Sequence, residues 1–345
     1  MTERGAIACL GAGRMARGLA VVFAYAGHRV SIVDLKPRSE ADFGRVAAEA
    51  VAEVRSTLGM LAGFALFPPA AVDGIASRVT VVGEARAGRA LAEAAVIFEG
   101  VPEVLDLKRE VLARASALAG PHPIIASTTS TIMVDDLSSA VAAPERFLNA
   151  HWLNPAFLIP LVELSPGART DPAITARLKT MLEGIGKVPV VCAARPGVIV
   201  PRIQALAMNE AARMVEEGVA SAQDIDKAIK YGFGFRYAVL GMLEFIDYGG
   251  GDILYYASRY LTEALGDQRY AAPPIIERNM REGNIGLKTG KGFLDYEGLD
   301  IETYRRQRLK ALVEMLGFMD LTRPPVLPEA APVPSPHSSV GRGFG

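Results

Sequence analysis

The feature that most constrains the fold is the run Gly11-Ala12-Gly13, which follows directly on a short apolar stretch at 6–10. A brief, wholly apolar run is typical of a strand that is buried on both faces of a parallel sheet. The residues after the glycines predict a helix over 15–26 that stops at Gly27, and 29–34 predicts a second strand. The chain therefore opens with a predicted strand–helix–strand unit whose first junction is a glycine turn.

This glycine turn predicts a dinucleotide site. Gly11 permits the tight turn, Gly13 lets the backbone approach a pyrophosphate, and the following helix offers its positive end to the phosphates. Ala16 stands at the third position of the fingerprint, where alanine is accepted. The alternative is a plain strand-to-helix turn that holds no ligand. The residues of the turn that we expect to contact the cofactor are Gly11, Gly13, Arg14 and Met15.

An acidic residue at the end of the second predicted strand makes the dinucleotide interpretation stronger. Asp34 stands where a carboxylate can accept both ribose hydroxyls of the adenosine half. A negative charge there also repels a 2′-phosphate, so the sequence predicts NAD rather than NADP. Lys36 and Arg38 follow closely and would soften that preference.

Composition restricts the class of protein. The chain has 345 residues, half of them hydrophobic, and a formal net charge of -1, which gives no reason to expect nucleic acid or a membrane surface as partner. It has two cysteines, Cys9 and Cys192, and we find no signal-peptide pattern and no apolar run long enough to span a bilayer. We therefore expect a cytoplasmic, globular protein. We also expect a small-molecule substrate, and we assign no residue to a metal site.

Alternating patterns along the first part of the chain predict a Rossmann-type, doubly wound parallel sheet. Strand-like runs recur, with helical patterns between most of them, at 79–82, 95–100, 123–130, 147–154, 161–164 and 188–193. From 203 onward the pattern is mainly helical, and the end of the chain is rich in proline, serine and glycine. We therefore predict an NAD-binding domain at 1–195, an all-helical domain at 196–320, to which the resemblance described below assigns substrate binding and dimerisation, and a tail at 321–345.

One histidine stands out as a candidate catalytic base. His151 lies at the end of a predicted strand, where α/β sheets place groups that contact ligands, and Glu163 follows on the next predicted strand. A carboxylate beside an imidazole fixes its tautomer, which suits the abstraction of a proton from an alcohol. The alternative is that His151 is a hydrogen-bonded core residue and Glu163 a surface charge.

Several separated motifs between about residue 5 and residue 296 resemble those of the L-3-hydroxyacyl-CoA dehydrogenases. They are "GAGRMARG" with Asp34, "FEGVPEVLDLK", "ASTTST", "HWLNP", "AMNEAARMVEEGVAS" and "GLKTGKGFLDY". The resemblance implies that His151 is the general base, Glu163 its partner, and Ser130 and Asn209 the groups that hold the substrate. It also implies a homodimer, and it adds further residues near the cofactor, namely Glu103, Lys108, Asn154 and Lys288.

Two departures from this family leave the substrate open. No lysine occurs between Lys36 and Lys108, although the family binds coenzyme A through lysines on the helix after the second strand; the cations nearest to that site are Arg45, Arg55 and Arg78. The stretch 232–247 is closer to the L-gulonate 3-dehydrogenases and carnitine dehydrogenases, which act on free hydroxy acids. This likeness implies that Arg236 of the present chain binds a substrate carboxylate. Alternatively, Arg236 ties two helices together.

These observations predict an NAD-dependent dehydrogenase that acts on an L-3-hydroxyacyl-CoA, with 3-hydroxybutyryl-CoA as the default. A small free 3-hydroxy acid is the alternative. A non-catalytic NAD-binding protein, like the family members recruited as lens crystallins, is a third reading, but such a protein would need none of His151, Glu163, Ser130 and Asn209.

Overall fold

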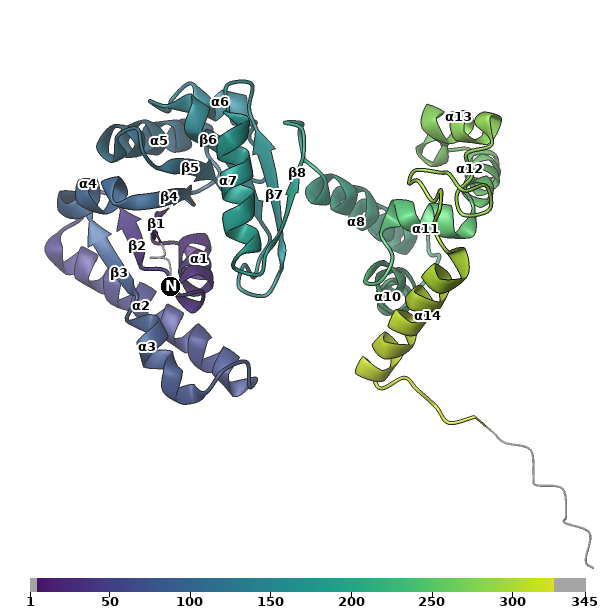
Figure 1. Cartoon of the computed structure of the whole chain (residues 1–345), viewed down its shortest axis with the longest axis horizontal. Helices are drawn as coiled ribbons and strands as arrows, with labels where there is room; N and C mark the ends of the chain where they lie inside the picture. The colour runs from purple at the N-terminus through teal and green to yellow at the C-terminus, as the bar shows by residue number, and fades with distance from the viewer. Residues whose placement is uncertain (1–4, 326–345) are drawn as a thin grey trace, which may run out of the picture. The chain divides into compact units, whose positions relative to one another are not determined.

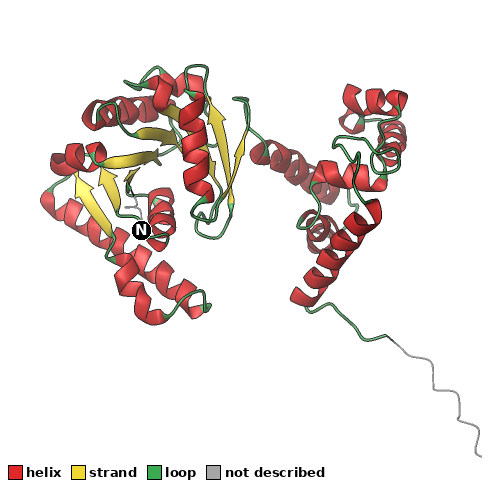
Figure 2. Ribbon diagram, in the orientation of Figure 1, coloured by secondary structure: helices red, strands yellow, loops and turns green. Residues whose placement is uncertain are grey.

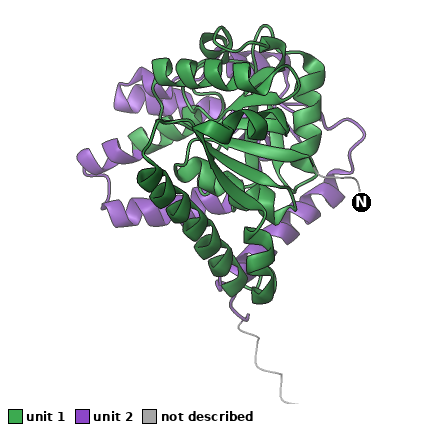
Figure 3. Cartoon of the chain, turned by 90° about the vertical axis from the view of Figure 1, so that its left-hand side faces the viewer, with its two compact units in different colours: residues 1–210 green, residues 211–345 purple. Residues whose placement is uncertain are grey.

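The computed structural model describes residues 5–325, which form two compact units that meet between residues 210 and 211 of the chain (Figure 3). Residues 326–345, most of the predicted tail, lie outside the described residues. The units divide inside helix α8 (Val200–Glu216), after the predicted boundary at residue 195, and that boundary stays a prediction. No helix of the described part of the chain is both long and apolar enough to cross a membrane.

The first unit is built on one eight-stranded sheet in the order β3-β2-β1-β4-β5-β6-β7-β8 (Figures 1 and 2). All neighbouring strands are parallel except β6 and β7, which are antiparallel. This confirms the Rossmann-type sheet. The strands are β1 (Ala6–Leu10), β2 (Val30–Asp34), β3 (Val79–Gly83), β4 (Ala94–Glu99), β5 (Ile124–Ser127), β6 (Phe147–Trp152), β7 (Leu161–Pro166) and β8 (Val188–Val191).

Helices connect the strands, and their ends follow local capping rules. Ser39 caps α2 by accepting a hydrogen bond from the backbone N–H of Asp42, and Asp171 caps α7, which has a proline in its first turn. The helices of this unit are α1 (Arg14–Tyr25), α2 (Glu40–Gly63), α3 (Val72–Ala76), α4 (Glu84–Ala92), α5 (Leu105–Ala119), α6 (Val134–Ser138), α7 (Pro172–Glu183) and the start of α8.

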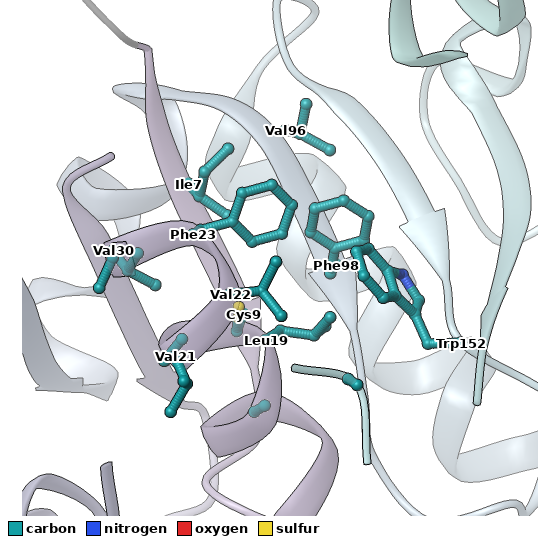
Figure 4. Packing of buried hydrophobic residues seen from close by; sticks show 14 of the residues in the cluster. Ile7, Cys9, Leu19, Val21, Val22, Phe23, Val30, Val96, Phe98 and Trp152 are labelled. Atoms are coloured by element: carbon teal, nitrogen blue, oxygen red, sulfur yellow. The ribbon is translucent and has the colours of Figure 1, made fainter. Parts of the chain in front are cut away.

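Strand β1 is buried on both faces, as its apolar sequence predicts. Ile7 and Cys9 pack into one hydrophobic cluster, and Ala8 and Leu10 pack into another on the opposite face. The first cluster holds three aromatic rings from α1, β4 and β6 (Figure 4). The rings of Phe23 and Phe98 are stacked at 5.2 Å, and Trp152 meets both edge-on. This packing fixes β4 and β6 against α1, and both strands carry polar side chains at or near their carboxyl ends.

The second unit is helical, as predicted, and few of its side chains are buried. Its most buried charged residue is Asp247, whose carboxylate accepts hydrogen bonds from the backbone N–H groups of Phe293 and Leu294 at 3.0 and 2.8 Å. The helices are α9 (Ala222–Ala228), the π-helical turn Ile229–Gly234, α10 (Phe235–Tyr237), α11 (Met242–Gly249), α12 (Gly251–Leu265), α13 (Pro274–Glu282) and α14 (Ile301–Phe318).

Candidate active site

The glycine turn and α1 form one end of a cleft. Gly11 has a φ of +92°, which favours glycine, and an added Cβ there would lie 3.5 Å from the carbonyl oxygen of Gly100 at the end of β4. Gly13 is the N-cap of α1, and Ala16 is buried. The cleft is lined by this turn, by 34–38, by 100–102 and by side chains of α5. A free helix N-terminus behind a glycine turn fits the pyrophosphate of a dinucleotide.

Asp34 lies at the end of β2 on this cleft, as predicted, but its carboxylate is already engaged. Arg38 donates from Nε to Oδ2, and the backbone N–H of Lys36 lies 3.3 Å from Oδ1. Arg38 therefore stands beside the carboxylate that is expected to accept the ribose hydroxyls.

His151 and Glu163 face each other across the antiparallel pair β6–β7. They are register partners, and His151 Nδ1 lies 2.7 Å from Glu163 Oε2. The other carboxylate oxygen accepts hydrogen bonds from the backbone N–H groups of Ile199 and Val200 at 3.0 and 2.8 Å, at the start of α8. Glu163 is therefore fully buried and is not a surface charge. A carboxylate at Nδ1 puts the proton on that nitrogen and leaves Nε2 as an acceptor.

A small cavity brings Ser130 together with this pair. Ser130, His151 and Glu163 all line it, as does Asn149, which the sequence analysis missed. The Asn149 side chain donates to the carbonyl of Ile132 at 2.9 Å, but its own buried oxygen has no hydrogen-bond partner among the described residues. Asn149 precedes His151 by two positions on one strand, so the period of a strand is the signal that could have found it.

Glu103 and Lys108 are held in a polar network rather than left free. Lys108 is 1% exposed and donates to both carboxylate oxygens of Glu99, at 2.9 and 3.1 Å, and to the carbonyl of Val101 at 3.1 Å. Glu103 lies 3.4 Å from the same ammonium. Although burial raises the pKa of Glu103, hydrogen bonds from Thr129 and Thr131 and the charge of Lys108 lower it to about 2. The buried Glu99 was not predicted as part of this group.

The remaining candidate residues lie elsewhere. Asn154 is exposed and lines a second cavity with Arg14 and Arg17, and Asn209 is exposed on α8 and is not among the residues that line the His151 cavity. In the second unit, Lys288 contacts Asp252 at 3.2 Å.

Arg236, also in the second unit, has contacts within its own helical region. It donates from Nε to the carbonyl of Gly232 at 3.1 Å, and its guanidinium lies 4.7 Å from the ring centre of Phe245 on α11. These contacts are those of a residue that ties helical segments together.

The arginines nearest the predicted coenzyme A site are all engaged by other groups. On α2, Arg45 pairs with Glu49 at 2.9 Å and Arg55 pairs with Asp73 at 2.8 Å. Arg78 donates to the carbonyl of Ala24 at 2.7 Å. Each would have to leave its partner, or share it, to bind a phosphate.

Comparisons with known proteins agree with this architecture. The sequence matches the family model described as "3-hydroxyacyl-CoA dehydrogenase, NAD binding domain" over residues 6–195 and that described as "3-hydroxyacyl-CoA dehydrogenase, C-terminal domain" over residues 197–296. It is 30% identical to a 5-formyl-3-hydroxy-2-methylpyridine 4-carboxylate 5-dehydrogenase of Mesorhizobium japonicum, over 91% of this chain and 98% of that protein. It is 32% identical to a 3-hydroxybutyryl-CoA dehydrogenase of Bradyrhizobium diazoefficiens, over 85% of this chain and 95% of that protein. A solved 3-hydroxyacyl-CoA dehydrogenase of Archaeoglobus fulgidus superposes with a TM-score of 0.72 at 31% identity, over 92% of this chain and 100% of that one.

Proposed function

Because this chain belongs to the 3-hydroxyacyl-CoA dehydrogenase family of NAD-dependent oxidoreductases, we propose that it oxidises the hydroxyl group of an L-3-hydroxyacyl substrate with His151 as general base. The observation that carries this proposal is the 2.7 Å contact between His151 Nδ1 and the buried carboxylate of Glu163. That contact leaves Nε2 as an acceptor in a side chain that lines the same cavity as Ser130.

The chemistry follows from these positions. His151 Nε2 takes the proton of the substrate hydroxyl as the carbonyl forms, and the carboxylate of Glu163 at Nδ1 stabilises the resulting imidazolium. Glu163 is held for this task by the two N–H groups at the start of α8. Ser130 hydrogen-bonds the reacting oxygen and orients its carbon. The resemblance to the family assigns the same task to Asn209, although Asn209 does not line the His151 cavity. The glycine turn and Asp34 would hold NAD, which would supply the hydride acceptor when bound.

For the substrate we propose 3-hydroxybutyryl-CoA, because the family likeness covers both matched regions of the chain, 6–195 and 197–296. A small free 3-hydroxy acid is the second candidate. It is favoured by the arginines of α2, which already pair with carboxylates, and by the relative from Mesorhizobium japonicum, which is named for a carboxylate substrate. A free acid needs no anchor for the phosphates of coenzyme A.

The deciding experiment compares NADH oxidation with acetoacetyl-CoA and with acetoacetate, in the wild type and in Arg236→Ala. The thioester proposal expects acetoacetyl-CoA to be the better substrate and Arg236→Ala to be nearly neutral. Reduction of acetoacetate alone, abolished by Arg236→Ala, would establish the free acid instead, since loss of a desolvated charged anchor costs about two to three decades in kcat/KM. In either case His151→Ala should lose at least ~10²-fold in kcat while it still binds NADH. Unchanged turnover of that variant would refute the mechanism.

We also propose that the protein acts as a homodimer in the cytoplasm. Ile253, Tyr256 and Tyr260 form an exposed apolar stripe on α12, at helical spacing, with exposed fractions of 60%, 64% and 70%. A second copy of the chain is the partner that would cover it. Light scattering at micromolar concentration should give twice the monomer mass, and a stable monomer would refute this assembly.

A further inference from the structure

One carboxylate in the segment between β4 and α5 holds the turn that presents Ser130. Glu103 Oε1 accepts hydrogen bonds from the backbone N–H groups of Ser130 and Thr131, both at 3.1 Å. The same oxygen accepts from the hydroxyl of Thr131 at 3.0 Å and from the hydroxyl of Thr129. A single oxygen thus gathers donors from three consecutive residues, which is the arrangement of an anion that orders a turn.

Two buried charged residues, Lys108 and Glu99, hold both this carboxylate and the turn in place. Glu103 Oε2 faces Lys108, and Lys108 is bound to Glu99, whose side chain is completely buried. The hydroxyl of Ser127 donates to Glu99 and lies 3.3 Å from the backbone N–H of Thr129. The turn is therefore tied to one buried lysine by two routes, through Glu103 and through Glu99 with Ser127.

We propose that Glu103 is a positioning residue that fixes Ser130 in the place from which its hydroxyl contacts the reacting oxygen. The proposal rests on the function proposed above for Ser130. Within 5–325, no hydrogen bond occupies the Ser130 hydroxyl, whereas the backbone N–H of the same residue is held by Glu103. The scaffold thus immobilises the backbone and leaves the hydroxyl available to the cavity that Ser130 shares with His151.

This role differs from the cofactor contact that the family resemblance implies for Glu103 and Lys108. An ammonium has three donors, and those of Lys108 match its three short contacts, two to Glu99 and one to the carbonyl of Val101. One oxygen of Glu103 is occupied by the turn, and the other faces Lys108. Glu103 and Lys108 therefore both take part in the hydrogen-bond network that holds the turn at 129–131.

The test is a double-mutant cycle in the full chain, measured with NADH and with acetoacetyl-CoA or acetoacetate, whichever the wild type reduces. We expect Glu103→Ala to lower kcat about 10–100-fold, less than or equal to the loss in Ser130→Ala, because removal of one oriented donor to a reacting oxygen costs about 10²–10³-fold. Adding Glu103→Ala to Ser130→Ala should lower kcat by no more than about twofold further, since Glu103 acts through Ser130. The dissociation constant of NADH should stay within about threefold of the wild type.

Two further variants control for misfolding of Glu103→Ala and for the loss of a carboxylate as such. Glu103→Gln keeps an oxygen for the turn and should recover part of the activity, and it carries the test if Glu103→Ala fails to fold. Asp106→Asn is the matched control, because Asp106, three residues after Glu103 in the first turn of α5, is 94% exposed and pairs only weakly, at 3.8 Å, with Arg109.

The outcomes separate this inference from the proposed function. Additive losses in the double variant, or a tenfold weaker NADH complex with unchanged kcat, would overturn the positioning role. Full activity in Glu103→Ala beside a loss in Ser130→Ala would also refute that role and leave the proposed function standing. Full activity in Ser130→Ala would instead refute the function proposed for Ser130, and the positioning role with it.

Discussion

Replacing Glu163 by glutamine tests the His151–Glu163 pair with little change in the shape of the side chain. In the wild type one carboxylate oxygen accepts from two backbone N–H groups, at 3.0 and 2.8 Å, and the other faces His151 Nδ1 at 2.7 Å. An amide has a single oxygen, and the two N–H groups require that oxygen. Its NH₂ group must then face Nδ1, which can only accept, so the imidazole proton moves to Nε2 and the base is lost.

The size of the effect follows from that change of tautomer. General-base catalysis contributes about 10²–10⁴-fold, and reversing the tautomer of a catalytic histidine costs about 10⁴ in kcat in a serine protease. We therefore expect Glu163→Gln to lower kcat by about 10²–10⁴-fold, or roughly 2.7–5.4 kcal/mol at 1.36 kcal/mol per decade.

The assay is steady-state turnover followed by NADH absorbance, with NADH affinity and thermal unfolding measured on the same samples. Both of these should stay near the wild type, because the amide keeps the packing and most of the hydrogen bonds. Glu183→Gln, at an exposed position at the end of α7, is the control. A kcat within about threefold of the wild type would refute the assignment of tautomer and, with it, the role of Glu163.

Three other perturbations probe separate parts of the first unit. Arg38→Ala should lower the kcat/KM ratio of NADP to NAD about tenfold, because it removes the cation beside Asp34; an unchanged ratio would mean that Arg38 does not reach the 2′ position. Phe98→Ala should lower the free energy of unfolding in urea by about 3–5 kcal/mol, since its ring packs between Phe23 and Trp152, and a loss below 1 kcal/mol would contradict that packing. The pKa of Glu103 lies at about 2, below its ordinary value of 4.5, so its charge stabilises the fold above pH 4.5 and that contribution is lost as the pH falls toward 2. The difference in unfolding free energy between wild type and Glu103→Gln should therefore be constant above pH 5 and shrink at pH 3, and a difference that grows in acid would have the wrong sign.

The sequence predicted the sheet and the cleft well because both depend on local patterns. The apolar run before Gly11 and the position of Asp34 after the next strand are short-range signals, and the structure confirms the fold class that they indicate. His151 and Glu163 were also found by their place near strand ends. The family resemblance predicted that the two side chains pair, but the local residue patterns did not, because the register of β6 against β7 is set by the folded sheet.

The polar groups that the sequence missed are buried ones. Glu99 is the last residue of an apolar strand and Asn149 sits inside another, so each looks like an ordinary break in a hydrophobic run. Lys108 was named from the family resemblance, but its burial against Glu99 was not predicted, because a lysine on a helix is usually exposed. Only the packed structure shows that these charges meet.

The reversal of direction between β6 and β7 has a consequence for engineering this scaffold. Because His151 and Glu163 are direct partners in the strand ladder, their distance is set by backbone hydrogen bonds on either side of them and not by the intervening residues 153–160. That connection can be altered while the pair stays assembled, provided that Asn154, which is expected to lie near the cofactor, is kept. A single residue inserted within either strand would instead turn His151 or Glu163 to the opposite face of the sheet and separate the two side chains. A change in this connection is therefore expected to disturb the His151–Glu163 pair less than a change within either strand.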